Sequence, residues 1–284
     1  MKPYYEDGDV TLYHGDCREV LPTFAPDSFD CVFADPPYGI GKADWDHTFP
    51  TEWIPDAAKV APTLAITPGV WNLPSVPTPP GMRYRWTLSA HLRNGMTRGP
   101  LGLGNWIPCL VYTRDEWINW TNAFADWCDA SGVSRRDLAA ATGTSHMAAW
   151  WTSRLPHRAQ IPSPEQWAKI RARWNPPAQL DHFVQAGNPT RQGPDSAAFN
   201  VGGEPKADHP SPKPLDVMCW FLNRLPGYRL PDRGVLDPFA GSGTTLLAAR
   251  TLGRRSVGIE VSEQYCELVA SRLSQGDLFE GLGA

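Results

Sequence analysis

The segment Asp35-Pro36-Pro37-Tyr38 places a carboxylate, two prolines and an aromatic ring at one point of the chain. It follows an apolar run, residues 29–34, that is typical of a buried strand. Open α/β sheets carry their chemistry at the carboxyl ends of their strands. The carboxylate and the proline carbonyls accept hydrogen bonds, and proline has no N–H that would compete. The segment therefore predicts a site that accepts hydrogen bonds beside a ring able to stack.

A glycine turn, Gly241-Ser242-Gly243, follows an apolar strand that ends at Asp237 and precedes a predicted helix. The next strand ends at Glu260, about 20 residues farther on, where an acidic side chain can bind ribose hydroxyls. A P-loop would have a lysine after its last glycine, and a dinucleotide fingerprint would have a third glycine where this chain has Leu246. The pattern favours a nucleoside-type ligand with a small anionic group, which S-adenosylmethionine fits.

The strands near the C-terminus cannot form a stable sheet by themselves. They must be completed by strands from the N-terminal part, where Leu12-Tyr13 and the run before Asp35 are the candidates. This predicts an α/β fold in which four acids follow strands along one edge of the sheet: Asp16, Asp35, Asp237 and Glu260.

Four segments of this chain resemble motifs of the amino-methylating DNA methyltransferases, in particular the permuted group in which the catalytic motif precedes the cofactor motif. Residues 35–38 match the catalytic tetrapeptide, and residues 237–243 match the cofactor loop. Residues 12–16 are similar to the acidic motif that contacts the adenine of the cofactor. Residues 209–214, His-Pro-Ser-Pro-Lys-Pro, are similar to the segment beside the methionine end.

The resemblance covers about residues 8–113 and 205–274. It implies a Rossmann-like, circularly permuted methyltransferase sheet that binds S-adenosylmethionine and carries a small helical insert. The reaction implied is methyl transfer to the exocyclic amine of a base swung out of double-stranded DNA. The site residues implied are Asp35, Pro36, Pro37 and Tyr38 for catalysis, and Asp16, His209, Lys213, Asp237, Phe239, Ala240, Gly241, Ser242, Gly243, Thr244, Thr245 and Glu260 for the cofactor.

An exocyclic amine is a poor nucleophile because its lone pair is delocalised into the ring. Asp35 and the carbonyl of Pro36 could hold its hydrogens while Tyr38 stacks on the base. Aspartate at position 35 resembles the adenine-N6 enzymes, whereas serine there is more typical of the cytosine-N4 enzymes. Cytosine-N4 methylation and methylation of an RNA or protein amine are the alternatives. A non-catalytic DNA-binding regulator would leave the tetrapeptide without a purpose.

Methylation of a ring carbon would need a Pro-Cys nucleophile. Pro108-Cys109 lies inside an apolar run, so we expect a buried structural thiol there, with the proline at an edge strand or at a strand start. The six cysteines show no C-x-x-C pair, and we expect neither a disulfide framework nor a metal site.

Residues 121–174 differ in composition from the segments before them, with alanine-rich and arginine-bearing stretches that predict a helical bundle. Ser134 is a predicted N-cap with Asp137 three residues later, Gly143 ends the first helix, and a second helix is predicted from Ser145 to Arg154. Helix, glycine turn and helix form the outline of a helix-turn-helix and resemble the repressor-type DNA-binding domain. The residues expected to contact DNA are Arg135, Arg136, Ser145, His146, Arg154 and Arg158.

The expected domains are a first catalytic part at 1–113, a target-recognition region at 114–205 with the bundle at about 121–174, and a cofactor-binding part at 206–284. Residues 175–212 are rich in Pro, Gly, Asn and Ser and predict a long loop. The net charge of −4 argues against nonspecific coating of nucleic acid. No apolar run is long enough for a membrane span, so we expect a cytoplasmic protein. The expected partners are double-stranded DNA and, in a restriction system, a cognate endonuclease, with the chain a monomer or homodimer.

Overall fold

The computed structural model describes residues 2–42, 46–95, 97–99, 102–114, 116–144, 146–154, 160–178, 180–181, 184, 195–200, 213–225 and 233–274. The chain divides into two compact units. Unit 1 comprises Met1–Tyr112 with Asp195–Ala284, and unit 2 comprises Thr113–Pro194. None of the helices in the described ranges is both long and apolar enough to cross a membrane.

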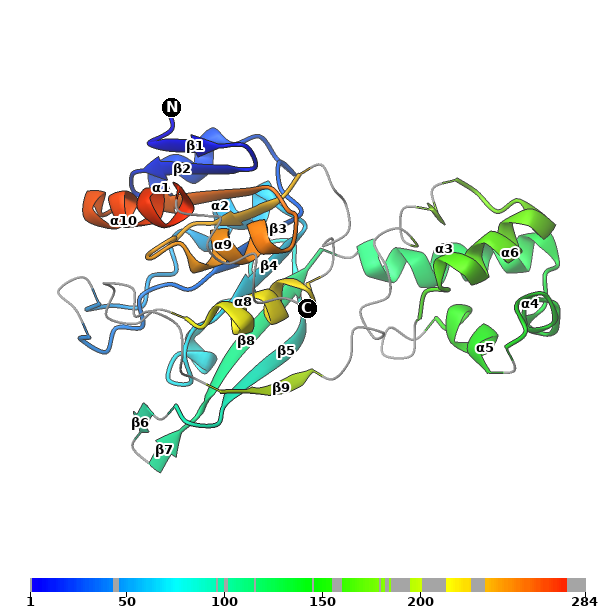
Figure 1. Ribbon diagram of the computed structural model, residues 1–284. Coiled ribbons are helices and arrows are strands. Elements are labelled where there is room, and N and C mark those ends of the chain that lie inside the picture. The colour runs from blue at the N-terminus through cyan, green and yellow to red at the C-terminus, as the bar shows by residue number, and fades with distance from the viewer. Residues whose placement is uncertain are drawn as a thin grey trace. The chain divides into compact units, whose positions relative to one another are not determined.

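Unit 1 is built on a mixed β-sheet. Among the described residues its strand order is β1-β2-β11-β10-β3-β4-β8-β5-β9 (Figure 1), and β6 pairs with β7 in a separate two-stranded sheet. The strands are β1 (Tyr5–Asp7), β2 (Val10–His14), β3 (Cys31–Ala34), β4 (Thr63–Ile66), β5 (Arg83–Leu92), β6 (Thr97–Gly99), β7 (Gly102–Gly104), β8 (Trp106–Thr113), β9 (Ser196–Phe199), β10 (Val235–Asp237) and β11 (Ser256–Glu260).

The two distant parts of unit 1 interleave in the middle of the sheet. Strand β10 pairs in parallel with β3, with Val235 opposite Cys31, and β11 pairs in parallel with β2, with Ser256 opposite Val10. Strands β10 and β11 are also parallel. The prediction that N-terminal strands complete the C-terminal sheet is confirmed. Because these four strands are parallel, their carboxyl ends meet at one edge, where the four acids lie: Asp16, Asp35, Asp237 and Glu260.

Helices cover both faces of this sheet. Alternate residues of β3 point to opposite faces: Val32 and Ala34 pack with α1 and α2, while Cys31 and Phe33 pack with α8 and α9. Helix α10 packs against β2. Burial on both faces explains why β3 is apolar throughout and why β4 is apolar after Thr63. The helices of unit 1 are α1 (Cys17–Val20), α2 (Ile54–Val60), α8 (Leu215–Leu222), α9 (Thr244–Thr251) and α10 (Glu263–Ser274), with 3₁₀ turns η1 (Leu21–Thr23) and η2 (Leu73–Ser75).

Two details of the sheet differ from the sequence expectations. Strand β9 lies inside the predicted loop 175–212 and pairs in parallel with β5, because Phe199 can pack on Trp220 and join the core under α8. Strand β8 is interior, between β4 and β5, so Pro108 does not mark an edge strand. The proline occupies the third position of β8, close to its start.

Unit 2 is a helical bundle of α3 (Glu116–Ser131), α4 (Arg135–Thr142), α5 (Met147–Trp151) and α6 (Pro164–Trp174). A core that includes Phe124, Leu138, Trp151 and Ile170 holds the helices together. The predicted cap of α4 is confirmed: the Ser134 hydroxyl accepts the N–H of Asp137, and Asp137 accepts the N–H of Ser134.

The second helix of the predicted helix-turn-helix is shorter than expected. Helix α5 begins at Met147 and ends at Trp151, so neither end of the predicted Ser145–Arg154 helix is reached. His146 provides no side-chain cap, and the buried Ala148 and Trp151 hold the helix by packing. The Thr152 hydroxyl then bonds back to the carbonyl of Ala148. Ser145 itself lies outside the described residues.

Candidate functional site

A cavity of about 660 Å³ opens at the carboxyl ends of the parallel strands of unit 1. It is lined by residues of the tetrapeptide 35–38 and of the glycine loop 241–243. The predicted site residues that line it are Asp16, Asp35, Pro36, Pro37, Tyr38, Lys213, Asp237, Phe239, Ala240, Gly241, Ser242, Thr244, Thr245 and Glu260. Gly243 is not among the lining residues, and His209 lies outside the described part of the chain.

Asp35 directly follows β3, and described residues donate three hydrogen bonds to its carboxylate. Its Oδ1 atom accepts from the Thr67 hydroxyl at 2.6 Å and from the Tyr38 hydroxyl at 2.8 Å. Its Oδ2 atom accepts from the Lys213 ammonium at 2.5 Å. Both carboxylate oxygens of Asp35 thus act as hydrogen-bond acceptors in the structure.

Lys213 contacts the tetrapeptide 35–38, whereas the sequence predicted that it would lie beside the cofactor. Its Nζ atom is 5.0 Å from the centroid of the Tyr38 ring as well as bonded to Asp35. Burial opposes the charge on Lys213, but Asp35 and Tyr38 outweigh it and raise its pKa. Burial, and then Asp35, raise the pKa of the Tyr38 phenol. Lys213 therefore stays an ammonium ion next to a neutral phenol.

The glycine loop connects β10 to α9. Gly243 adopts a φ of +80°, and a side-chain carbon there would meet Val269 at 3.0 Å, so only glycine fits the turn. The loop carbonyl of Ser242 accepts a hydrogen bond from Arg272, which holds the turn against α10. The turn thus brings backbone close to the cavity at the start of a helix.

Two buried acids stand on either side of this loop. Glu260, 7% exposed, accepts the N–H of Gly241 at 2.8 Å through one oxygen and the N–H of Ser262 at 2.9 Å through the other. Burial raises the pKa of Glu260, although these backbone donors oppose the shift. Asp237 accepts the N–H of Phe239, and burial raises the pKa of this carboxyl to about 7. Both acids can still accept hydrogen bonds from a ligand in the cavity.

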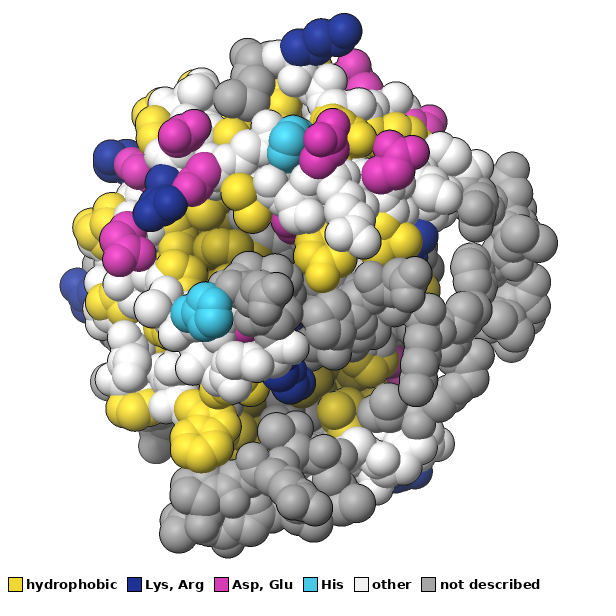
Figure 2. Space-filling view, turned by 90° about the vertical axis from the view of Figure 1, so that its left-hand side faces the viewer, with side chains coloured by type: hydrophobic (Ala, Val, Ile, Leu, Met, Phe, Trp, Pro, Cys, Tyr) yellow, Lys and Arg dark blue, Asp and Glu magenta, His cyan; other side chains and the backbone are white. Residues whose placement is uncertain are grey.

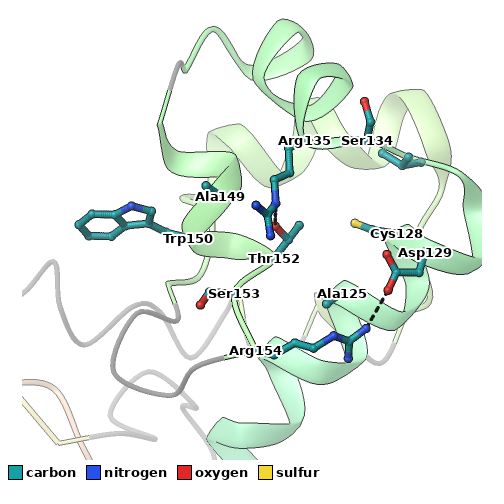
Figure 3. A pocket seen from close by; sticks show the side chains of 11 residues that line it. Ala125, Cys128, Asp129, Ser134, Arg135, Ala149, Trp150, Thr152, Ser153 and Arg154 are labelled. Carbon is teal, nitrogen blue, oxygen red and sulfur yellow. Dashed lines mark hydrogen bonds and ion pairs between the residues drawn. The ribbon is translucent and has the colours of Figure 1, made fainter.

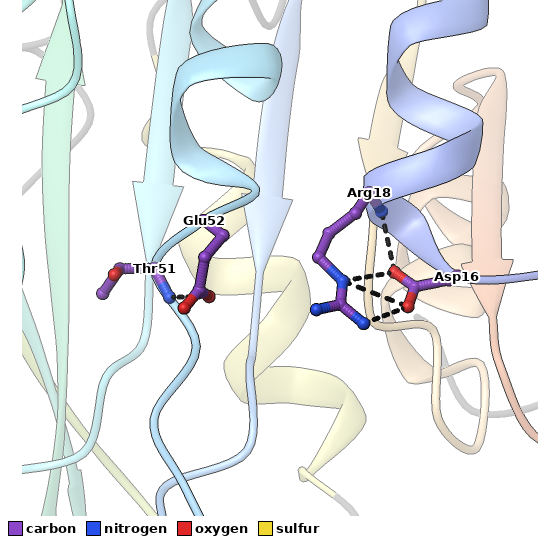
Figure 4. Close-up of polar contacts among 4 residues, drawn as sticks. All are labelled: Asp16, Arg18, Thr51 and Glu52. Carbon is purple, nitrogen blue, oxygen red and sulfur yellow. Dashed lines mark hydrogen bonds and ion pairs between the residues drawn. The ribbon is translucent and has the colours of Figure 1, made fainter.

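Asp16 caps α1 and is engaged by its neighbour Arg18 through the backbone N–H and the guanidinium (Figure 4). The hydrogen bond from the Arg18 side chain lowers the pKa of Asp16. Glu52 accepts the N–H of Thr51, and backbone donors lower its pKa. Figure 4 shows Arg18 between the two acids, bonded to Asp16, and its charge also contributes to lowering the pKa of Glu52, so Arg18 offsets part of the negative charge at this wall of the cavity.

Some lining residues carry no sequence signal that singles them out. Asp46 is buried and accepts the N–H groups of Gly39 and Lys42, which closes the loop after the tetrapeptide. The Trp53 indole packs edge-on against Phe239 with ring centroids 5.2 Å apart. From the sequence alone, an acid or a tryptophan in such a loop segment would be predicted to lie on the surface, and only the folded structure shows that it lines the cavity.

Cys109 is fully buried in β8, and burial raises the pKa of its thiol. It does not line the cavity, which agrees with a structural role and disfavours attack on a ring carbon. In the described part of the chain no cluster of His, Cys, Asp and Glu side chains is arranged to hold a metal ion. The face shown in Figure 2 mixes acidic, basic and hydrophobic side chains among its coloured residues, and carries no basic patch there.

Unit 2 has a cavity of about 600 Å³ between α3, α4 and α5 (Figure 3). Arg135 lines it and donates to the Thr152 hydroxyl at 2.9 Å. The Arg154 guanidinium is held by Asp126 and Asp129. Of the residues predicted to contact DNA, Arg135, Arg136 and His146 are exposed, Arg154 is exposed but paired, and Ser145 and Arg158 lie outside the described residues.

Comparisons with known proteins agree with this geometry. A family model described as DNA methylase, N6_N4_Mtase, matches residues 199–271. The chain is 28% identical to the Type II methyltransferase M.ScaI of Streptomyces caespitosus over 96% of this chain and 84% of that protein. It is 26% identical to the Type II methyltransferase M2.DpnII of Streptococcus pneumoniae over 96% of this chain and 92% of that protein. The crystal structure of an M1.HpyAVI–SAM complex superposes with a TM-score of 0.54 at 18% identity, over 93% of this chain and 98% of that one.

Proposed function

We propose that this chain, which belongs to the amino-methylating DNA methyltransferases, transfers a methyl group to the N6 amine of adenine within a specific DNA sequence. One observation carries the proposal. Asp35 and Tyr38, from the N-terminal part, line the same cavity as the glycine loop and Glu260, from the C-terminal part. A donor held by the loop and an amine held by Asp35 would then share one enclosed space.

The cavity suits S-adenosylmethionine, which when bound supplies the methyl group. Glu260 offers acceptors for ribose hydroxyls beside the loop, and Asp16 offers an acceptor at the cavity wall once Arg18 releases it. Asp237 and the loop backbone would hold the methionine end, whose ammonium favours an ionised carboxylate. The absence of a third glycine and of a P-loop lysine fits a ligand without a pyrophosphate.

Asp35 and the carbonyl of Pro36 would hold the hydrogens of the target amine, so that its nitrogen lone pair points to the donor. The Asp35 carboxylate is already fixed by Thr67 and Lys213, which costs no reorganisation at the moment of reaction. The Nζ atom of Lys213 lies 5.0 Å from the centroid of the Tyr38 ring, so the ammonium is beside the space in which the base would stack.

The choice of adenine rests on Asp35, since aspartate at this position resembles the adenine-N6 enzymes. For sequence recognition we assign unit 2. Arg135 and Arg136 are exposed at the start of α4, where backbone N–H groups and basic side chains can bind phosphate. The exposed Trp150, which lines the same cavity as Arg135, adds an apolar surface in unit 2.

The test is methylation of duplex DNA by the purified chain with S-adenosylmethionine, followed by digestion to nucleosides and mass spectrometry. We expect N6-methyladenine with the wild type and none with Asp35→Ala, while calorimetry shows cofactor binding retained. Asp56→Ala, which removes a surface acid paired with Lys59, is the control and should stay active. N4-methylcytosine would correct the base, and methylation of RNA or protein alone would overturn the proposal.

A further inference from the structure

We infer that Thr67 is a positioning residue for Asp35, which fixes the carboxylate so that one defined acceptor site remains for the target amine. The inference rests on the proposed function and adds a residue that no sequence motif includes. Thr67 directly follows β4, the neighbour of β3 in the sheet. Its backbone N–H donates to the carbonyl of Ala34 at 2.9 Å, which places the threonine beside Asp35.

The Thr67 hydroxyl has a single proton, and the geometry directs it to Asp35. The distance to Asp35 Oδ1 is 2.6 Å, whereas the distance to the Ala34 carbonyl is 3.4 Å, too long to compete. An ionised carboxylate cannot donate in return. Thr67 is only 1% exposed, so the donor of this contact is shielded from solvent.

The acceptor positions of Asp35 can be counted. A carboxylate oxygen accepts about two hydrogen bonds along its lone pairs. Oδ1 is filled by the Thr67 and Tyr38 hydroxyls, and Oδ2 accepts from Lys213 alone among the described residues. The remaining position is on Oδ2, and the amine of the target base enters there, next to the lysine.

Removing the Thr67 hydroxyl frees the carboxylate to turn, because the last torsion of aspartate is broad and roughly two-fold. Lys213 and Tyr38 would then compete for either oxygen, and the acceptor left for the amine would no longer be in one place. The cofactor contacts at Glu260 and the glycine loop do not involve Thr67. The loss should therefore fall on the methyl-transfer step and spare cofactor binding.

The experiment compares Thr67→Val, Thr67→Ala and Thr67→Ser with wild type at saturating duplex DNA and S-adenosylmethionine. We expect Val and Ala to lower the single-turnover rate about 10- to 100-fold, since a hydrogen bond to a charged group is lost, and Ser to restore most of it. The cofactor dissociation constant and the fluorescence of 2-aminopurine at the target position should stay unchanged. Thr63→Val, at the other end of β4 and also buried, is the matched control and should keep the wild-type rate.

A wild-type rate in both Val and Ala variants, or a Ser variant as slow as Val, would overturn the role of the hydroxyl while the proposed function stands. Cofactor affinity that falls together with the rate would show a packing role and overturn it too. Absence of DNA methylation by the wild type would overturn the proposed function and this inference with it. Two replacements without a hydroxyl keep the test decisive if one of them fails to fold.

Discussion

Replacing Glu260 by glutamine should weaken cofactor binding while leaving the protein folded. In the structure the two oxygens of Glu260 accept one backbone N–H each, from Gly241 and Ser262. Glutamine keeps the shape and one acceptor oxygen, but its NH₂ group faces the other N–H donor. One charge-assisted hydrogen bond is lost from the loop, and the negative charge available to ribose hydroxyls is lost from the cavity.

A hydrogen bond to a charged group contributes about 1.5–3 kcal/mol, so the dissociation constant for S-adenosylmethionine should rise about 10- to 100-fold. Folding should suffer less, because burial raises the pKa of Glu260 and glutamine removes the cost of the buried charge. Titration calorimetry gives the first quantity and differential scanning calorimetry the second. Glu263→Gln, an exposed acid in the first turn of α10, is the control. Unchanged affinity in Glu260→Gln would refute the ribose role and leave the acid as a support of the loop.

Two further predictions follow from charge. Burial raises the pKa of Asp237 from 3.8 to about 7, so between these pH values the carboxyl ionises in the unfolded chain before it does in the folded one, and the folded protein loses stability as pH rises. The Tm of Asp237→Asn minus the Tm of wild type should therefore increase over this range. A constant difference would contradict the raised pKa. Arg136→Ala should weaken DNA binding and reduce the slope of log K against log salt by about one, as measured by fluorescence anisotropy. Lys169→Gln, whose charge is already paired with Glu165, should leave that slope nearly unchanged, and equal slopes in all three proteins would argue against phosphate contact by Arg136.

The joining of N-terminal and C-terminal strands in one sheet was predictable, because the C-terminal part has too few strands to form a sheet by itself. Two C-terminal strands cannot stand alone, and apolar runs before Asp16 and Asp35 were the available partners. The glycine turn at 241–243 and the helix cap at Ser134 could also be predicted from the sequence, since each depends on a local backbone requirement. These features need only neighbours in sequence.

The remainder depends on contacts between segments far apart in the chain. Nothing in the local pattern says that Lys213 bonds Asp35, or that Thr67 and Asp46 point towards the tetrapeptide. Strand β9 was missed because its four residues alternate weakly and gain their burial from α8. The length of helix α5 was overestimated because the helix lacks an N-capping side chain and depends on the packing of Ala148 and Trp151.

The interleaved sheet also constrains the order in which the molecule can form during synthesis. The hydrogen bond from Gly234 to Asp30 joins residues 204 positions apart, and β10 inserts between strands made early and late. Until β10 and β11 emerge from the ribosome, β3 lacks its partner β10 and β2 lacks its partner β11, so an edge of each early strand stays uncovered. The helical segment between them is contiguous, so it can fold in the meantime and shorten the span that the last strands have to close.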